Sequence, residues 1–369
     1  MKRYVSLDVL RGLTVAMMIV VNNPGSWSNA YPILMHKEWN GCTPCDLVFP
    51  FFLFCVGASM AFALAKYDSL NAGALKKIFL RGGLLYLVGL LTMAFPFYPS
   101  RLDSSLTFWQ NWLEWLGGIR LVGILPRIAL CYILGSVLAL WLKSFKKIAC
   151  AIGVLCALHI GTLLLFGGPE GALTLEGNFA RRLDIAVFGE NHIYHGYGIP
   201  FDPEGLLGVL TGTCTVLIGY LIGRSIRTSA SEQSQDGVSA RTFAISAGLL
   251  LAGLALSIFI PINKPLWSVS YVFYAAGWAS FVLALLIYLI DYKGWEKPFF
   301  PFKALGMNAL ALYVLSAVLM VINWRHIGWV YTAVFGSTKF LSLLFALLYM
   351  LLHLVIAVIM YKKKIFIKL

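Results

Sequence analysis

The chain has 369 residues, of which 60% are hydrophobic and only 12% charged, and its net charge is +13. No water-soluble fold buries that much apolar surface, so the composition indicates a membrane protein with the lipid bilayer as its surroundings. The 29 Lys and Arg residues are scattered over short segments between apolar stretches. Since no basic face or tail could follow a phosphate backbone, nucleic acid is excluded as a partner.

Ten apolar runs are each close to the roughly 20 residues that cross a bilayer. They predict an all-α fold, a polytopic transmembrane helical bundle that forms a single domain over residues 1–369. The first run follows a basic start, as in a signal peptide, but no small-residue cleavage site lies near Val21, so we expect a retained helix. The predicted helices are 6–22, 46–65, 78–97, 121–142, 147–166, 205–223, 241–260, 268–290, 304–322 and 340–361.

The basic residues are divided unequally between the two sides that these helices define. Nineteen of the 29 lie in the two termini, in the even-numbered connections or at the helix ends next to them, eight lie in the odd-numbered connections, and two, Arg11 and Arg127, lie deeper inside helices. Because short cytoplasmic loops are enriched in Lys and Arg, we expect both termini in the cytoplasm. The segment 225–240, rich in Ser and Gln, is predicted to be a flexible cytoplasmic linker.

Three longer segments, 23–45, 98–120 and 167–204, are then predicted on the outer side. The second contains Trp109, Trp112 and Trp115 at helical spacing, which favours an amphipathic helix in the membrane interface. No internal repeat is visible, so the inverted repeat typical of many transporters is missing.

The seven cysteines are mostly inside apolar runs, where a thiol behaves as a small hydrophobic group. Their odd number and their placement do not indicate a disulfide framework. Cys42 and Cys45 match the CxxC pattern, but without the strand and helix context of a thioredoxin-like motif we expect no redox role.

Charged residues inside predicted helices need a partner or a function, because a charge in the bilayer is costly. Asp8 and Arg11 lie three residues apart on one helix face and form either a mutual ion pair or part of a site. In the second case Arg11, with Arg81 and Arg127, binds the phosphates of an anionic ligand from the cytoplasm. The three arginines are equally consistent with snorkelling anchors.

The stretch between the first two helices combines His36, Trp39, Asn40 and Asp46 on the predicted outer side. Histidine changes its charge near neutral pH, so it is able to take a proton from an amine and return it elsewhere, as acyl transfer requires. The alternative is an ordinary loop histidine. Asn22, at the outer end of the first helix, either donates a hydrogen bond to a developing oxyanion or caps the helix.

A second outer cluster, with His192, His195, Asp202 and Glu204, imitates a metal site. Its spacing fits no helical ligand pattern and its loop is rich in glycine, so we expect no metal.

Several of these motifs resemble the heparan-alpha-glucosaminide N-acetyltransferase family and its bacterial members. The resemblance begins with Ser6 to Gly12, Asn22, His36 to Asp46 and Pro50. The loop before His36 differs, because it reads Asn-Pro-Gly-Ser-Trp where the family has a run of glycines. The likeness continues in the family's order through Pro126–Tyr132, Tyr197–Gly208, Pro261–Tyr271, Gly306–Ala309 and Tyr361–Phe366.

The resemblance implies an acetyl-CoA-dependent N-acetyltransferase. Acetyl-CoA would be the cytoplasmic co-substrate, and the acceptor would be a glucosamine-type amino sugar or glycan on the other side. His36 matches the family's active-site histidine and Asn22 its asparagine partner. The bacterial relatives imply a multi-pass protein of the bacterial inner (cytoplasmic) membrane. A homodimer is a possible assembly.

These implications define a set of expected site residues. We expect His36, Asn22 and Asp46 to be catalytic, with His36 acting as general base or carrying the acetyl group itself, and Asp46 orienting His36. We expect Asp8, Arg11, Arg81 and Arg127 to bind the coenzyme, and Trp39, Asn40, Glu204, Asn263, Lys264, Trp267 and Asn308 to bind the acceptor.

The alternative function is a transporter or flippase for a sugar or a lipid-linked glycan intermediate. The same polar residues would then line a conduit.

Overall fold

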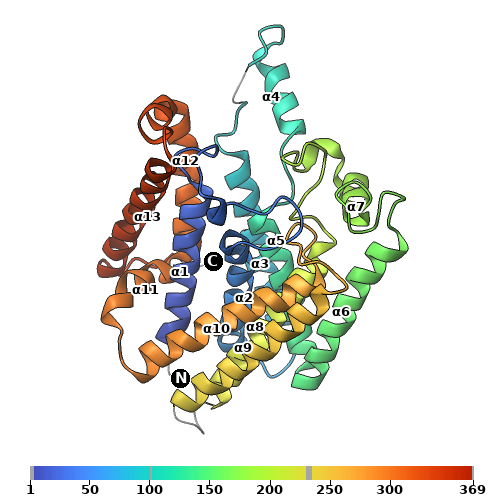
Figure 1. The fold of residues 1–369 in the computed structure, drawn as a ribbon, viewed down its shortest axis with the longest axis vertical. Coiled ribbons are helices and arrows are strands. Elements are labelled where there is room, and N and C mark those ends of the chain that lie inside the picture. Colours follow the sequence, from blue (N-terminus) through green and yellow to red (C-terminus); the bar gives the residue numbers. More distant parts are fainter. Residues whose placement is uncertain (1–3, 100–101, 230–234, 368–369) are drawn as a thin grey trace. The chain divides into compact units, whose positions relative to one another are not determined.

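The structure is a computed structural model that describes residues 4–99, 102–229 and 235–367 (Figure 1). These residues form helices and loops without a β-strand, apart from one isolated bridge between Gly41 and Asn263. Within these described ranges, nine helices are long and apolar enough to cross a membrane, and a bent helix pair makes up to ten. The predicted all-α, polytopic bundle is therefore confirmed.

The orientation of the bundle stays a prediction from the charge asymmetry. Four of the residues that contribute to this asymmetry lie outside the described residues: Lys2, Arg3, Arg101 and Lys368.

The chain divides into two compact units. The first comprises Met1–Asp68, Thr215–Lys264 and Val269–Leu369, and the second comprises Ser69–Cys214 and Pro265–Ser268. Helix α8 (Gly208–Ser229) begins in the second unit and ends in the first.

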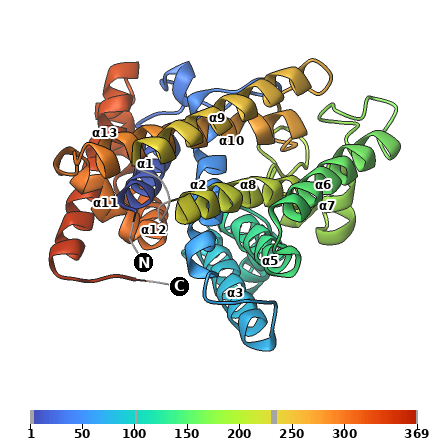
Figure 2. The same cartoon turned by 90° about the horizontal axis from the view of Figure 1, so that it is seen from below.

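The helices of the first unit pack mainly through their apolar faces. Helices α9 and α10 run side by side in both views (Figures 1 and 2), and α1 packs against α2 and α11. Short 3-10 or π-helical turns lie at Pro32–Leu34, Ile287–Tyr292, Lys297–Phe299 and Tyr331–Phe335. Besides the end of α8, the helices are α1 (Val5–Asn22), α2 (Pro44–Ala63), α9 (Gln235–Ser257), α10 (Val269–Leu286), α11 (Phe300–Met307), α12 (Ala309–Val330) and α13 (Lys339–Lys362).

Helices α2 and α8 approach each other so closely that only glycine fits at the contact. A Cβ added to Gly219 would lie 2.3 Å from the carbonyl oxygen of Phe54, and one added to Gly223 would lie 2.5 Å from that of Ala58. The two glycines are four residues apart, the spacing that lets helix backbones meet in a membrane.

Replacing Gly219 with leucine is expected to lower the thermal midpoint of unfolding of the detergent-purified protein, because the side chain has no space against α2. Forcing atoms into a packed contact costs about 1–3 kcal/mol or more. A Cβ on Gly248 of α9 meets no atom within 4 Å, so Gly248→Leu is the matched control. Equal midpoints for the two variants would contradict the close contact.

The ninth predicted helix, 304–322, is not continuous. The chain bends by 75° between Lys297–Met307 and Ala309–Trp324. Asn308 lies at the break, with its side-chain nitrogen 3.0 Å from the oxygen of Ile365 and its side-chain oxygen accepting the N–H of Ile367 at 2.9 Å. Both ends of its amide therefore hold the C-terminal segment, and its role in binding an acceptor stays a prediction.

The connection between α8 and α9 is more helical than expected. Residues 225–229 extend α8, and 235–240 belong to α9, so the predicted flexible linker over 225–240 is wrong for these residues. Residues 230–234 of that prediction lie outside the described residues.

The second unit contains three of the predicted membrane helices and two shorter ones. Helix α3 starts six residues before its predicted beginning because Asn71 caps it, accepting the N–H of Ala74 at 2.8 Å. Asn178 likewise caps α7, a helix that hydropathy alone did not indicate. The helices are α3 (Ala72–Ala94), α4 (Phe108–Gly117), α5 (Ile124–Leu142), α6 (Phe145–Leu165) and α7 (Phe179–Phe188), followed by the 3-10 turn Glu190–His192.

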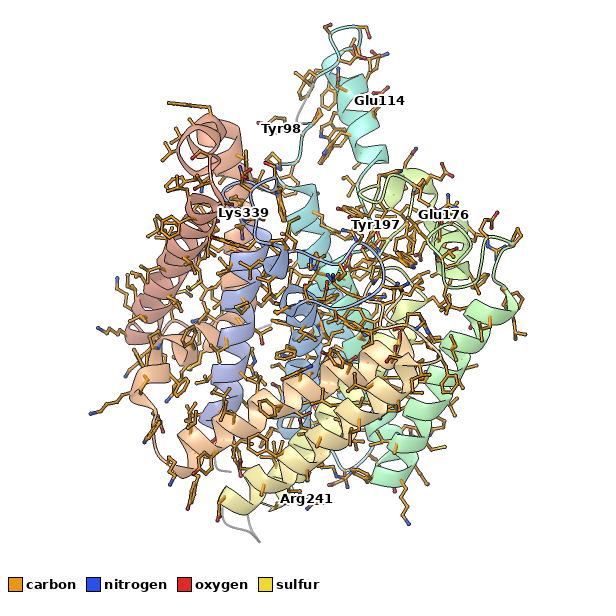
Figure 3. The ribbon with its side chains drawn as sticks, in the orientation of Figure 1. Tyr98, Glu114, Glu176, Tyr197, Arg241 and Lys339 are labelled. Carbon is orange, nitrogen blue, oxygen red and sulfur yellow. The ribbon has the colours of Figure 1, made fainter. Side chains whose placement is uncertain are left out.

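Helix α4 is the amphipathic helix predicted from the spaced tryptophans. Trp109 and Trp112 form an edge-to-face pair with ring centroids 6.2 Å apart, and Trp109 is 68% exposed. The helix projects beyond the ends of α3 and α5 and carries Glu114 at its side (Figures 1 and 3). Its location in a membrane interface stays a prediction.

Candidate active site

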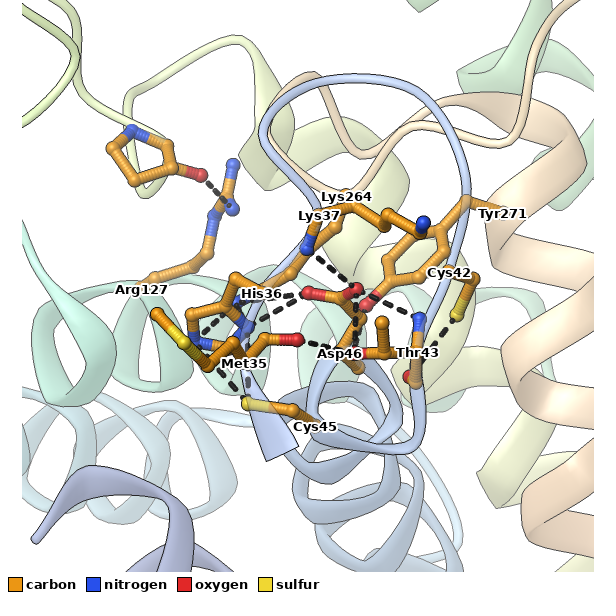
Figure 4. Close-up of polar contacts among 11 residues, drawn as sticks. Met35, His36, Lys37, Cys42, Thr43, Cys45, Asp46, Arg127, Lys264 and Tyr271 are labelled. Carbon is orange, nitrogen blue, oxygen red and sulfur yellow. Dashed lines mark hydrogen bonds and ion pairs between the residues drawn. The ribbon is translucent and has the colours of Figure 1, made fainter. Parts of the chain in front are cut away.

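The first turn of α2 holds Asp46, the buried acid of a polar cluster, in a conformation that the local sequence explains. Thr43 is the N-cap and Pro44 the first helical residue, so Asp46 occupies the third position, where its carboxylate turns back to the cap. Asp46 Oδ2 accepts the N–H of Thr43 at 2.9 Å and the N–H of Lys37 at 3.3 Å (Figure 4). Its side chain is fully buried, so this carboxylate is fixed in one orientation.

His36 completes the cluster from the preceding loop. Its Nδ1 lies 2.7 Å from Asp46 Oδ1, and its side chain is 47% exposed. A carboxylate that accepts from Nδ1 sets the tautomer, so Nδ1 carries the hydrogen and Nε2 keeps its lone pair. The arrangement is a half-exposed imidazole with a basic nitrogen, oriented by a buried acid.

A second loop, 261–264, brings a cation to the same imidazole. Lys264 Nζ lies 3.0 Å from His36 Nδ1 and 3.1 Å from Nε2, and 3.8 Å from Asp46 Oδ1. The two loops are joined by the N–H of Gly41, which donates to the oxygen of Ile262 at 2.7 Å. Gly41 has a φ of +106°, a conformation that favours glycine.

Two further expected residues belong to this junction. The amide nitrogen of Asn263 donates to the side-chain oxygen of Asn40 at 3.1 Å. Asn40, Asn263 and Lys264 therefore gather beside His36, while their contact with an acceptor stays a prediction. Trp39 is half-buried in the same loop.

Asn22 is the last residue of α1 and is half-buried. Among the described residues no hydrogen bond joins its side chain to His36. Its role as an oxyanion donor stays a prediction.

The CxxC pair lies beside the imidazole but lacks the properties of a redox site. Cys45 Sγ is 3.2 Å from His36 Nδ1, and both cysteines are free thiols. Burial, reinforced by the negative charge of Asp46, raises the pKa of the Cys42 thiol to about 12. Redox-active CxxC pairs need a lowered pKa, so the structure gives no support to this role.

Arg11 joins three helices of the first unit. Its two terminal nitrogens donate to the oxygen of Gly306 at 3.2 Å and to Ser59 Oγ at 2.7 Å. Asp8 Oδ1 lies 3.6 Å from Arg11, so the mutual ion pair, one of the two alternatives for these residues, is present. Coenzyme binding by either residue stays a prediction.

Arg127 of the second unit is buried rather than open to an anion. Its guanidinium donates to the oxygens of Pro203 at 2.7 Å and Gly205 at 3.2 Å, and it stacks on Trp267 at 4.9 Å. Arg127 is 2% exposed and Trp267 fully buried. The contacts of Arg127 with a phosphate and of Trp267 with an acceptor stay predictions. Arg81, in contrast, is exposed on α3 and lies over the ring of Tyr132 at 5.2 Å.

The second outer cluster is an ion-pair network. Arg120 holds Asp202 through two nitrogens, at 2.7 and 2.5 Å, and Glu204 through one at 2.5 Å. Glu204 thus pairs with Arg120 instead of lying open to an acceptor. His192 Nδ1 lies 2.7 Å from the oxygen of Ile119, and no group of His, Cys, Asp and Glu within the described ranges could hold a metal ion. The sequence offered no signal for Arg120.

Asp184, on α7, is a buried acid that the sequence did not indicate. Its Oδ1 accepts the N–H of Leu206 at 2.8 Å, whereas its Oδ2 is buried without a hydrogen-bond partner. Burial raises the pKa of this carboxyl to about 7, against the lowering effect of the Leu206 amide.

Asp184 is therefore expected to make stability depend on pH. Below about pH 4 the carboxyl of Asp184 is protonated in both the folded and the unfolded protein. Between about pH 4 and 7 only the folded protein keeps the proton, so raising the pH favours the unfolded state. The free energy of unfolding should decrease by up to about 4 kcal/mol as pH rises through this window, and the thermal midpoint should fall with it. Asp184→Asn should lose this dependence when midpoints are measured from pH 4.5 to 8. A variant with the wild-type slope would exclude Asp184 as its source.

Comparison with known proteins identifies relatives. Residues 3–169, which include His36 and Asp46, match the family model described as heparan-alpha-glucosaminide N-acetyltransferase, catalytic. The human heparan-alpha-glucosaminide N-acetyltransferase is 27% identical over 362 residues, which cover 84% of this chain and 52% of the human protein. The mouse protein of the same name is 28% identical over 416 residues, covering 98% of this chain and 60% of its own length. The chain thus spans only part of these relatives.

Proposed function

We propose that the chain is a member of the heparan-alpha-glucosaminide N-acetyltransferase family, and that it transfers an acetyl group from acetyl-CoA to the amine of a glucosamine-type sugar. The observation that carries the proposal is the pair of His36 and Asp46. An imidazole with Nδ1 held at 2.7 Å by a buried carboxylate presents Nε2 as a base. General base catalysis of this kind contributes about 10²–10⁴-fold to a rate.

The proposed reaction needs one proton transfer and one acyl transfer. The amine nitrogen attacks the thioester carbonyl carbon, and His36 Nε2 removes the proton that the nitrogen must lose. The carbon–sulfur bond breaks, and the proton goes to the coenzyme thiolate. The rival route, in which Nε2 first carries the acetyl group, would show ping-pong kinetics.

The arrangement across the membrane is part of the proposal. The described part of the chain contains nine or ten candidate spans, and the basic residues are in excess on one predicted side. Both observations support a multi-pass protein with a cytoplasmic donor and an acceptor on the other side. For a bacterial member of the family this is the inner membrane.

The protein reconstituted in liposomes and supplied with labelled acetyl-CoA tests the function. Glucosamine and galactosamine are offered as acceptors, with glucose as the control that lacks an amine. We expect labelled N-acetylated amino sugar and no labelled glucose. Saturable sugar flux without any acetylated product would overturn the proposal and favour a transporter.

A further inference from the structure

The cation beside His36 has no role in the proton transfer described above. Lys264 Nζ lies 3.0 and 3.1 Å from the two ring nitrogens, and its side chain is only 13% exposed. We propose that Lys264 is a catalytic residue, the donor that stabilises the oxyanion formed when the acetyl carbonyl is attacked. This inference rests on the proposed function and deepens it.

The two nearly equal distances determine where the ammonium lies. A point in the ring plane equally close to Nδ1 and Nε2 would collide with the Cε1 carbon, so Nζ lies over the face of the imidazole of His36. The in-plane lone pair of Nε2 is therefore left uncovered by Lys264. A base and a hydrogen-bond donor lie side by side, which is the combination that addition to a carbonyl requires.

The ammonium is held in place rather than mobile. The backbone next to Lys264 is paired through the bridge between Gly41 and Asn263, and Asn263 also bonds the side chain of Asn40. Asp46, 3.8 Å from Nζ, compensates the charge of the largely buried ammonium. A donor that is already oriented needs no rearrangement when charge develops on the substrate oxygen.

Lys264 keeps its proton throughout the proposed reaction. As the bond between the amine nitrogen and the carbonyl carbon forms, the π electron pair moves to the oxygen, and Lys264 donates a hydrogen bond to that oxygen without losing its proton. When the carbonyl re-forms, the carbon–sulfur bond breaks and the thiolate leaves. The proton removed by His36 goes to the thiolate.

The same charge selects the reactive form of the acceptor. A protonated amine is repelled by the ammonium of Lys264, whereas a neutral amine is not. Only the neutral amine has the lone pair needed for attack.

Three variants of the full-length protein in liposomes test the proposal: Lys264→Met, Lys264→Arg and the control Lys37→Met. Lys37 is an exposed neighbour of His36 that contacts Asp46 through its main-chain N–H, which the substitution keeps. We expect Lys264→Met to lower kcat about 10²–10³-fold with KM for the amino sugar nearly unchanged. Lys264→Arg, which keeps the charge and donors, should recover part of the loss, and Lys37→Met should match wild type.

A raised KM with wild-type kcat in Lys264→Met would overturn the assignment, because it would make Lys264 an acceptor-binding residue. Equal kcat in Lys264→Met and wild type would also overturn it. If Lys264→Met fails to fold, as judged by its thermal midpoint, Lys264→Gln replaces it in the comparison with Lys264→Arg. Failure of the proposed function itself is distinguishable, since wild type would then form no acetylated sugar.

Discussion

Replacing His36 with alanine is expected to lower acetyl transfer about 10³-fold, because the variant loses the base that accepts the amine proton. The buried Asp46 and the ammonium of Lys264 would remain, and the binding of both substrates should change little. The measurement is the initial rate of formation of labelled N-acetylated amino sugar at saturating acetyl-CoA.

A matched substitution of a different histidine tests whether the loss of activity is specific to His36. His195 is exposed in a loop of the second unit, so His195→Ala should keep the wild-type rate. Full activity in His36→Ala would show that the proton leaves by another route and would remove the basis of the proposed chemistry. His36→Gln, which keeps a polar side chain, should be as inactive as the alanine variant.

Replacing Arg120 with methionine is expected to give the largest loss of stability. The change leaves two carboxylates, Asp202 and Glu204, buried and close together without a cation. Breaking a buried ion pair by removing one partner costs about 3–5 kcal/mol. The thermal midpoint of the detergent-purified protein should fall accordingly.

Two further variants sharpen this comparison. Arg182 is exposed and lies over the ring of Phe179 at 5.8 Å, so Arg182→Met should cost little. Arg120→Lys should fall between wild type and Arg120→Met, because lysine keeps the charge but cannot hold Asp202 through two nitrogens. Equal midpoints for Arg120→Met and Arg182→Met would show that the network adds no stability.

Helices and caps were predictable where their cause is local. Apolar runs long enough to cross a bilayer predicted the all-α bundle, because each backbone group in lipid must be paired within its own segment. The break at Asn308 was not predictable from hydropathy, since both arms are apolar and Asn308 is held by hydrogen bonds to the distant residues Ile365 and Ile367. Helix α7 was missed because its charged residues mask its apolar face.

The expected site was only partly predictable, because some of its contacts join residues that are distant in the sequence. The residue types of His36 and Asp46, ten positions apart, indicated a base and its orienting acid, whereas Arg127 and Glu204 turned out to be occupied by main-chain oxygens and by Arg120. A charge inside an apolar sequence signals that a partner exists, but the partner lies far along the chain and is chosen by packing.

The sequence by itself determined the membrane class, the approximate spans and the capping motif that buries Asp46, because hydropathy and helix capping act within a few residues. Only the tertiary structure decided that Lys264, 228 residues from His36, lies over its imidazole ring. That contact depends on the pairing of two loops at Gly41 and Asn263, and such pairing is a property of the whole packed chain.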